Sequence, residues 1–114
     1  MLAGITFSHA ALALDVESFE KQRKEPSAST VGKLLTLYLL GVGEGFKWAN
    51  AALTAKKEAP LFCAPPILAL TAENYLIVVD RELELRREAY TRTDMPVEFI
   101  LLYGLQQQLP CPPK

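Results

Sequence analysis

Two cysteines are the residues of this chain whose type and spacing could do the most chemistry. Cys63 is followed by Ala64-Pro65-Pro66, and Cys111 stands between prolines near the end of the chain. An even pair of cysteines, in a short chain that opens with an export-like segment, is typical of one disulfide in an oxidising compartment. Given their separation, such a bond would stabilise the fold by roughly 4 kcal/mol in the chain-entropy description.

Other side chains offer little for catalysis or metal binding. The single histidine is His9, and two cysteines without a CxxC spacing complete neither a redox motif nor a zinc site. We interpret the carboxylates between residues 80 and 88 as a solvated helix face: Asp80, Glu82, Glu84 and Glu88. Glu44, among glycines in an apolar segment, is either a partly buried, paired carboxylate or an exposed one. We therefore predict no enzyme, no catalytic residue, no cofactor and no metal site.

Size and charge point to one globular domain. The chain has 114 residues, 50% hydrophobic and 22% charged, with 12 basic residues against 13 acidic ones. This balance, without a cluster of arginine or lysine, gives no indication of a nucleic-acid partner. No apolar run reaches the roughly 20 residues that cross a bilayer, so we predict no membrane insertion.

The first thirteen residues differ from the rest. Residues 1–13 are small and apolar, lack a charged side chain other than His9, and end in Ala-Leu-Ala. This pattern is typical of a secretory signal peptide that lacks its basic start, as when a start codon is misassigned. A buried N-terminal helix or strand is the alternative. The predicted organisation is therefore a truncated signal peptide over 1–13 and a helical domain over 14–114, exported to the periplasm.

The spacing of apolar residues predicts an all-α fold, a bundle of about four helices stapled by the disulfide. We expect a short helix over about 15–24 and a long one from residue 29 or 30 to about 55. A third helix begins after Thr71 and continues to about Tyr90, and a fourth is capped by Asp94 and ends before Pro110. The apolar residues of the long helix predict that it is central and covered on most sides.

Three glycines inside the long helix call for a reason. Gly41, Gly43 and Gly45 each lower helix stability by about 1 kcal/mol relative to alanine. Either the helix breaks there or another backbone comes very close, and we favour close approach on the face shared by Gly41 and Gly45. With Tyr38, these two glycines form the predicted packing face or homodimer seam.

The end of the third helix is the predicted partner-binding surface. Tyr90 lies between a charged helix and a polar turn, and tyrosine and arginine are common anchors of protein interfaces. The predicted contact residues are Arg86, Arg87, Tyr90, Arg92 and Asp94. The alternative is an ordinary exposed helix end.

Three short motifs together resemble a known family. They are the tyrosine-glycine segment at 37–42, the Phe-Cys-Ala-Pro-Pro step at 62–66 followed by Thr71, and the closing Leu-Pro-Cys-Pro at 109–112. In order and spacing over about residues 30 to 113, they resemble the type VI secretion amidase-immunity family, the Tai and Rap immunity proteins. One cysteine that often precedes the tyrosine-glycine segment in relatives is absent here.

The resemblance implies a small exported helical protein with an intramolecular disulfide, often a homodimer. Such proteins bind and block peptidoglycan amidases that neighbouring bacteria inject into the periplasm, without chemistry of their own. By position, the loop that contributes to the block would correspond to residues 91–95 with the end of the preceding helix. A second hypothesis is a small periplasmic stress or acid chaperone, which hides apolar surface in a dimer and releases it at low pH.

Overall fold

Helices are the only regular elements in the described part of the chain. The computed structural model describes residues 14–66 and 68–113, so the predicted signal peptide over 1–13 lies outside the described residues. The helices are α2 (Val16–Arg23), α3 (Thr30–Ala55), α4 (Ala72–Arg92) and α5 (Val97–Gln108). Over these described residues, the predicted all-α fold of about four helices with one disulfide is confirmed.

Local capping chemistry explains where three of the helices begin. Asp15 accepts a hydrogen bond from a backbone N–H in the first turn of α2, and Ser29 does the same for α3. Thr71 forms a capping box with Asn74, in which each side chain bonds the other residue's backbone N–H. These contacts satisfy N–H groups that a helix leaves free at its start, and they confirm the predicted beginnings of α2, α3 and α4.

The start of α5 differs from the prediction. Asp94 does not cap this helix; it has a positive φ of 53° in the turn between α4 and α5. The helix begins after Pro96, which has extended backbone angles and supplies no side-chain cap. The N–H of Val97 instead donates to the carbonyl of Leu14, 2.8 Å away, so a distant segment satisfies the helix end. Aspartate tolerates the left-handed conformation, which explains its place in this turn.

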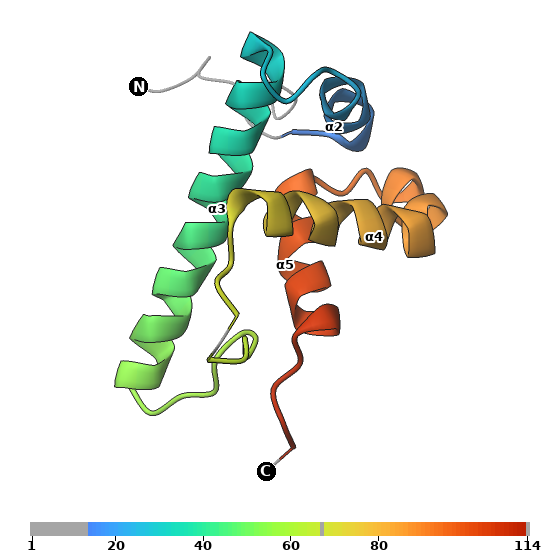
Figure 1. Cartoon of the computed structure of the whole chain (residues 1–114). Helices are drawn as coiled ribbons and strands as arrows, with labels where there is room; N and C mark the ends of the chain where they lie inside the picture. The colour runs from blue at the N-terminus through green and yellow to red at the C-terminus, as the bar shows by residue number, and fades with distance from the viewer. Residues whose placement is uncertain (1–13, 67, 114) are drawn as a thin grey trace, which may run out of the picture.

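The core lies where α4 and α5 pack together against α3. In Figure 1, α4 begins beside the middle of α3 and runs away from it to the right, α5 passes α4 and descends on the same side of α3, and α2 lies near the first turns of α3. Four residues of α5 are fully buried: Val97, Ile100, Leu101 and Leu105. Phe19 of α2 is 1% exposed, so the short helix closes the same core rather than standing apart.

The long helix α3 is not covered on most sides, contrary to the prediction. Its buried residues all lie at or before position 43: Gly32, Leu35, Leu39 and Gly43. Beyond Gly43 the helix continues for three turns without a fully buried residue, beside the irregular segment that leads to α4. Several large apolar side chains of α3 therefore remain at the surface.

Candidate functional site

The disulfide joins the end of the chain to the segment between α3 and α4. Cys63 and Cys111 are bonded across a sequence separation of 48 residues, with their Cα atoms 4.7 Å apart. The backbone N–H of Cys63 also donates to the carbonyl of Leu109 at 2.9 Å. Neither cysteine is free, so the pair has a structural role in this fold and offers no thiol for catalysis.

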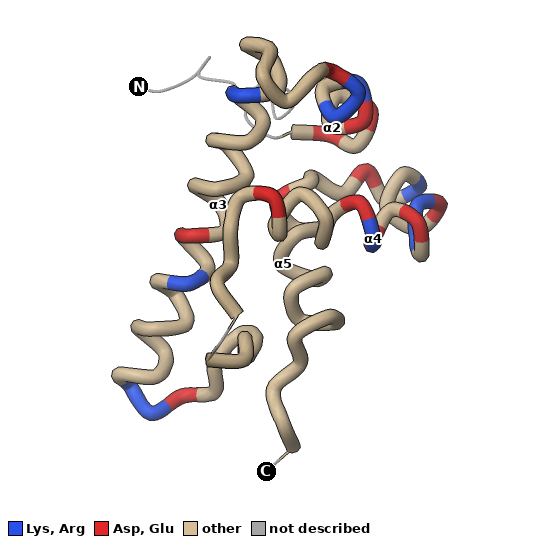
Figure 2. The backbone as a smooth tube through the Cα atoms, viewed as in Figure 1, with Lys and Arg blue, Asp and Glu red and all other residues tan. Residues whose placement is uncertain are grey.

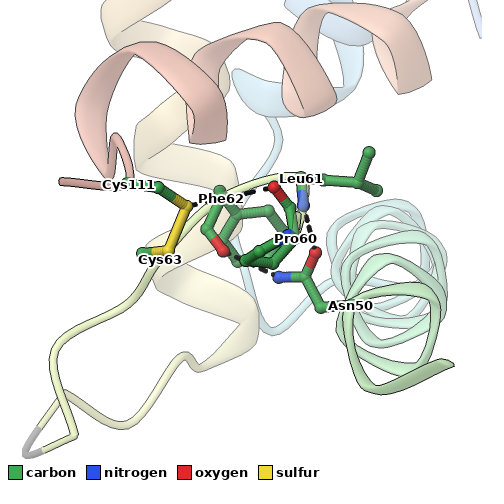
Figure 3. Close-up of a disulfide and its surroundings, with 6 residues drawn as sticks. All are labelled: Asn50, Pro60, Leu61, Phe62, Cys63 and Cys111. Atoms are coloured by element: carbon green, nitrogen blue, oxygen red, sulfur yellow. Dashed lines mark hydrogen bonds between the residues drawn. A yellow bond between two sulfur atoms is a disulfide. The ribbon is translucent and has the colours of Figure 1, made fainter. Parts of the chain in front are cut away.

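Asn50 fixes the same segment to α3. Its side-chain amide donates to the carbonyl of Phe62 at 2.9 Å and accepts from the N–H of Leu61 at 2.7 Å (Figure 3). One amide thus satisfies two backbone groups that no helix or strand would otherwise pair. Asn50 and the disulfide together hold the proline-rich segment between the second half of α3 and the C-terminal tail.

Only part of the predicted partner-binding surface is available to a partner. Arg92 and Asp94 are exposed at the end of α4 and in the following turn. Arg87 is exposed but pairs with Glu20 of α2, with a 2.7 Å contact. Tyr90 is 5% exposed, so it supports this surface from below and does not reach a partner.

Below this surface lies a buried polar network around Glu82. Glu82 is fully buried, so its interpretation as part of a solvated face is wrong. Both its carboxylate oxygens accept from Arg86, at 2.9 and 3.0 Å, and one also accepts from the hydroxyl of Tyr90 at 2.6 Å. The Arg86 guanidinium lies 5.6 Å from the centre of the Tyr103 ring in α5, a favourable cation–π distance.

This network coincides with a kink in α4. The backbone of Arg86 departs from helical values, with φ −139° and ψ 27°. The sequence did carry a signal for the network, because residues 82, 86 and 90 are spaced four apart and so lie on one helix face. The apolar Val79 and Leu83, which are buried, lie beside Glu82 on the helix. Their positions indicated that Glu82 could be buried as well.

The predicted packing face on α3 is wrong in one respect. Among residues 14–66 and 68–113, none comes close to Gly41 or Gly45, since a Cβ added at either would meet nothing within 4 Å. The close approach occurs instead at Gly43, on the opposite side, where an added Cβ would lie 2.4 Å from the Tyr75 ring. Among the described residues, therefore, no other helix packs closely against Gly41 and Gly45, while Tyr38 lies near Glu98 of α5.

Of the two alternatives for Glu44, a paired carboxylate or an exposed one, the structure shows the paired carboxylate. It accepts a hydrogen bond from the hydroxyl of Tyr75 at 3.0 Å and lies 3.3 Å from the ammonium of Lys47. Its side chain is 40% exposed, so water also reaches it. The contact joins α3 to α4 beside the close approach at Gly43, which indicates a structural role.

One hollow on the described surface, between α2 and α4, is lined by charges that already bind one another. It has a volume of about 420 Å³. Arg23 lies 2.9 Å from Asp80 and 3.2 Å from Glu73, while Arg87 pairs with Glu20. No group of three or more metal-ligating side chains gathers in the described ranges, 14–66 and 68–113. The hollow is therefore an ion-paired contact between two helices.

Alkaline pH is expected to destabilise the fold through its tyrosines. Burial, followed by the nearby Glu98 carboxylate, raises the pKa of Tyr38 to about 12. Burial and hydrogen bonds to Glu44 and Glu82 raise the pKa of Tyr75 and Tyr90 even more. Because these pKa values exceed the unfolded value of about 10, the stabilisation is complete below about pH 10 and is lost as pH rises through the folded values.

Denaturant titrations above neutral pH, with the ultraviolet absorbance of tyrosinate recorded in parallel, would measure this loss. The free energy of unfolding should fall steadily above about pH 10, and the fall should be smaller in Tyr75→Phe. Titration of Tyr38, Tyr75 and Tyr90 at their unfolded pKa in the folded protein would contradict the expectation.

None of the described helices combines the length and the apolar character that a bilayer span requires. Charge is concentrated on α2 and α4, while α3 carries few charged residues over most of its length (Figure 2).

Comparisons with protein-family models, with curated proteins and with solved structures gave no match to this chain.

Proposed function

We propose that this protein is an exported, immunity-type binding protein that blocks a peptidoglycan amidase effector of type VI secretion in the periplasm. The observation that carries the proposal is the pairing of Cys63 with Cys111. In the family that the sequence resembles, these cysteines belong to two separate motifs of a disulfide-stapled helical fold. The third motif, with Tyr38 and Gly41, lies in the long helix α3.

The block would be steric, because the described surface offers contacts rather than a reactive centre. The proposed contact surface is the end of α4 with the following turn, where Arg92 and Asp94 are exposed. Arg86 and Arg87 would flank it, and Tyr90 would hold it rigid from inside through its bond to Glu82. A rigid surface loses little conformational entropy on binding, which favours tight association.

A binding and inhibition assay would test this function. Purified protein would be added to secreted peptidoglycan amidases, beginning with any encoded beside its gene, and cleavage of peptidoglycan would be followed. We expect inhibition at one binding site per chain, weakened at least tenfold by Arg92→Ala combined with Asp94→Asn. Asparagine is chosen because it tolerates the positive φ at this position.

Lys33→Ala is the matched control, because it removes an exposed charge near the start of α3 and lies outside the proposed contact surface. Unchanged inhibition by the double variant would remove Arg92 and Asp94 from the proposal. Failure to bind any amidase would contradict the proposed function. Two free thiols in protein taken from its native location would remove the periplasmic assignment.

The proposal includes a homodimer, because α3 leaves apolar side chains uncovered in a single chain. The same observation favours a second candidate function, a periplasmic chaperone that exposes this surface in acid. Protection of unrelated proteins from aggregation at about pH 2–3, where carboxylates lose their charge, would support the chaperone. Absence of protection would exclude the chaperone and leave the immunity-type binding protein as the one remaining candidate.

A further inference from the structure

The outward face of α3 carries an apolar stripe that the rest of the described chain leaves largely exposed, with only Tyr38, at its edge, also lying near Glu98 of α5. The stripe consists of Leu34, Leu37, Tyr38, Gly41, Gly45, Trp48 and Ala52. Leu34 is 61% exposed, Leu37 63% and Trp48 76%, and nothing approaches the two glycines. Exposed side chains of this size, gathered on one helix face, mark an interaction surface rather than scattered surface residues.

The spacing of the stripe is that of a helix-pairing seam. Its central residues alternate steps of four and three along the helix: Leu34, Tyr38, Gly41, Gly45, Trp48 and Ala52. This is the heptad spacing that keeps one face of a helix toward a partner helix. The three charged residues inside α3 lie to one side of the seam: Lys33, Glu44 and Lys47. The seam is therefore suited to an apolar helix.

The pattern is also symmetric about the middle of α3. Counting from residue 43, Gly41 and Gly45 are equally distant, and so are Tyr38 and Trp48. Leu34 and Ala52 form a third such pair, with a large residue opposite a small one. Such a sequence is complementary to itself when a second copy is laid antiparallel against it, as a twofold axis requires.

The size of the stripe fits a homodimer of moderate strength. Its side chains expose on the order of 600 Å² per copy, at the upper end of the largest apolar patches of monomeric proteins. Two copies together would bury about 1,200 Å², the lower limit for specific stable interfaces. The glycines explain how two helices could come close at the centre, because they add no side chain between the backbones.

We propose that α3 pairs with α3 of a second copy of this chain, antiparallel, about a twofold axis beside residue 43. Gly41 faces the partner's Gly45, and Tyr38 packs against the partner's Trp48. The aromatic pairs at both ends of the glycine contact bury most of the exposed area. This inference rests on the homodimer in the proposed function and not on the amidase.

The mass of the full chain across a range of concentrations, measured by light scattering or sedimentation, tests the seam. Trp48 is the only tryptophan, so its emission also reports burial directly. We expect dilution to halve the mass and shift the emission to the red. Gly41→Leu with Gly45→Leu should weaken dimerisation at least tenfold with helix content preserved, because both positions have open space within the chain.

Leu85→Ala is the matched control, since Leu85 is 64% exposed on α4 and lies outside the seam. It should leave the dimer unchanged. A monomer at every concentration would overturn the proposal. If that monomer also showed the Trp48 emission of a buried indole, another segment of the chain would cover the face. A dimer that tolerates both leucines would overturn the seam while leaving a homodimer in place.

Cross-linking tests the antiparallel register. We expect Tyr38→Cys and Trp48→Cys, made in separate chains and mixed, to form a disulfide between subunits on oxidation. Either variant alone should give little covalent dimer, since each cysteine would face an aromatic residue. Cross-linking of the single variants with themselves would indicate parallel helices and overturn the register. None of these results depends on an amidase, so loss of the proposed function would leave them intact.

Discussion

Replacing Cys63 and Cys111 together by alanine is expected to lower the free energy of unfolding by about 4 kcal/mol. The bond closes a loop of 48 residues, and its loss releases that constraint from the unfolded chain. It also frees the C-terminal tail, whose Leu109 carbonyl accepts from Cys63 N–H. For a domain of ordinary stability, 5–15 kcal/mol, this is a large fraction of the total.

Urea denaturation under non-reducing conditions would measure this loss. Wild-type protein in reductant is the control, and it should lose a similar free energy without any substitution. If the free energies of unfolding of the double variant and the reduced protein both lie within about 1 kcal/mol of that of the oxidised protein, the bond does not hold the tail and the loop together as described.

Replacing Arg86 by methionine is expected to lower the free energy of unfolding by about 3 kcal/mol. The substitution keeps apolar length but leaves the fully buried Glu82 carboxylate with only the Tyr90 hydroxyl as a partner. A buried charge without its counter-charge is one of the few single changes that destabilise a domain this strongly. We take the lower end of the usual range because the Arg86 side chain is 37% exposed.

Two further variants would separate charge from packing. Adding Glu82→Gln to Arg86→Met should recover most of the loss, because the neutral amide can still accept from Tyr90. Arg81→Met is the matched control, an arginine on the exposed part of the same helix. Denaturant midpoints would give each free energy. A single Arg86→Met variant as stable as the control would show that the ion pair contributes nothing to the fold.

The two proposed surfaces can be used at the same time. The stripe lies on α3, while Arg92 ends α4 and Asp94 lies in the turn after it, and Figure 1 shows α4 ending away from α3. A dimer joined through α3 would therefore present two copies of the contact surface. Each copy would remain free to block one effector molecule, which makes dimerisation and inhibition separable by substitution.

Local signals explain why much of the fold could be predicted. Asp15, Ser29 and Thr71 are side chains that cap helices through contacts within three residues, so their neighbours in sequence are sufficient to identify them. Asp94 misled the prediction for the same reason. It has the chemistry of a cap, but the distant carbonyl of Leu14 satisfies the N–H of Val97 instead.

By itself, the sequence determined the helices, their three capped starts and the pairing of the two cysteines. The helices and their starts depend on residue type and on short-range spacing, whereas the pairing followed from the chain having only two cysteines. Only the tertiary structure decided which side of α3 faces the core, because Leu34 and Leu35 are equally apolar and point to different sides. It likewise placed Tyr75 of α4 against Gly43 and buried Glu82. Burial is settled by which surfaces meet, and distant segments of the chain supply those surfaces.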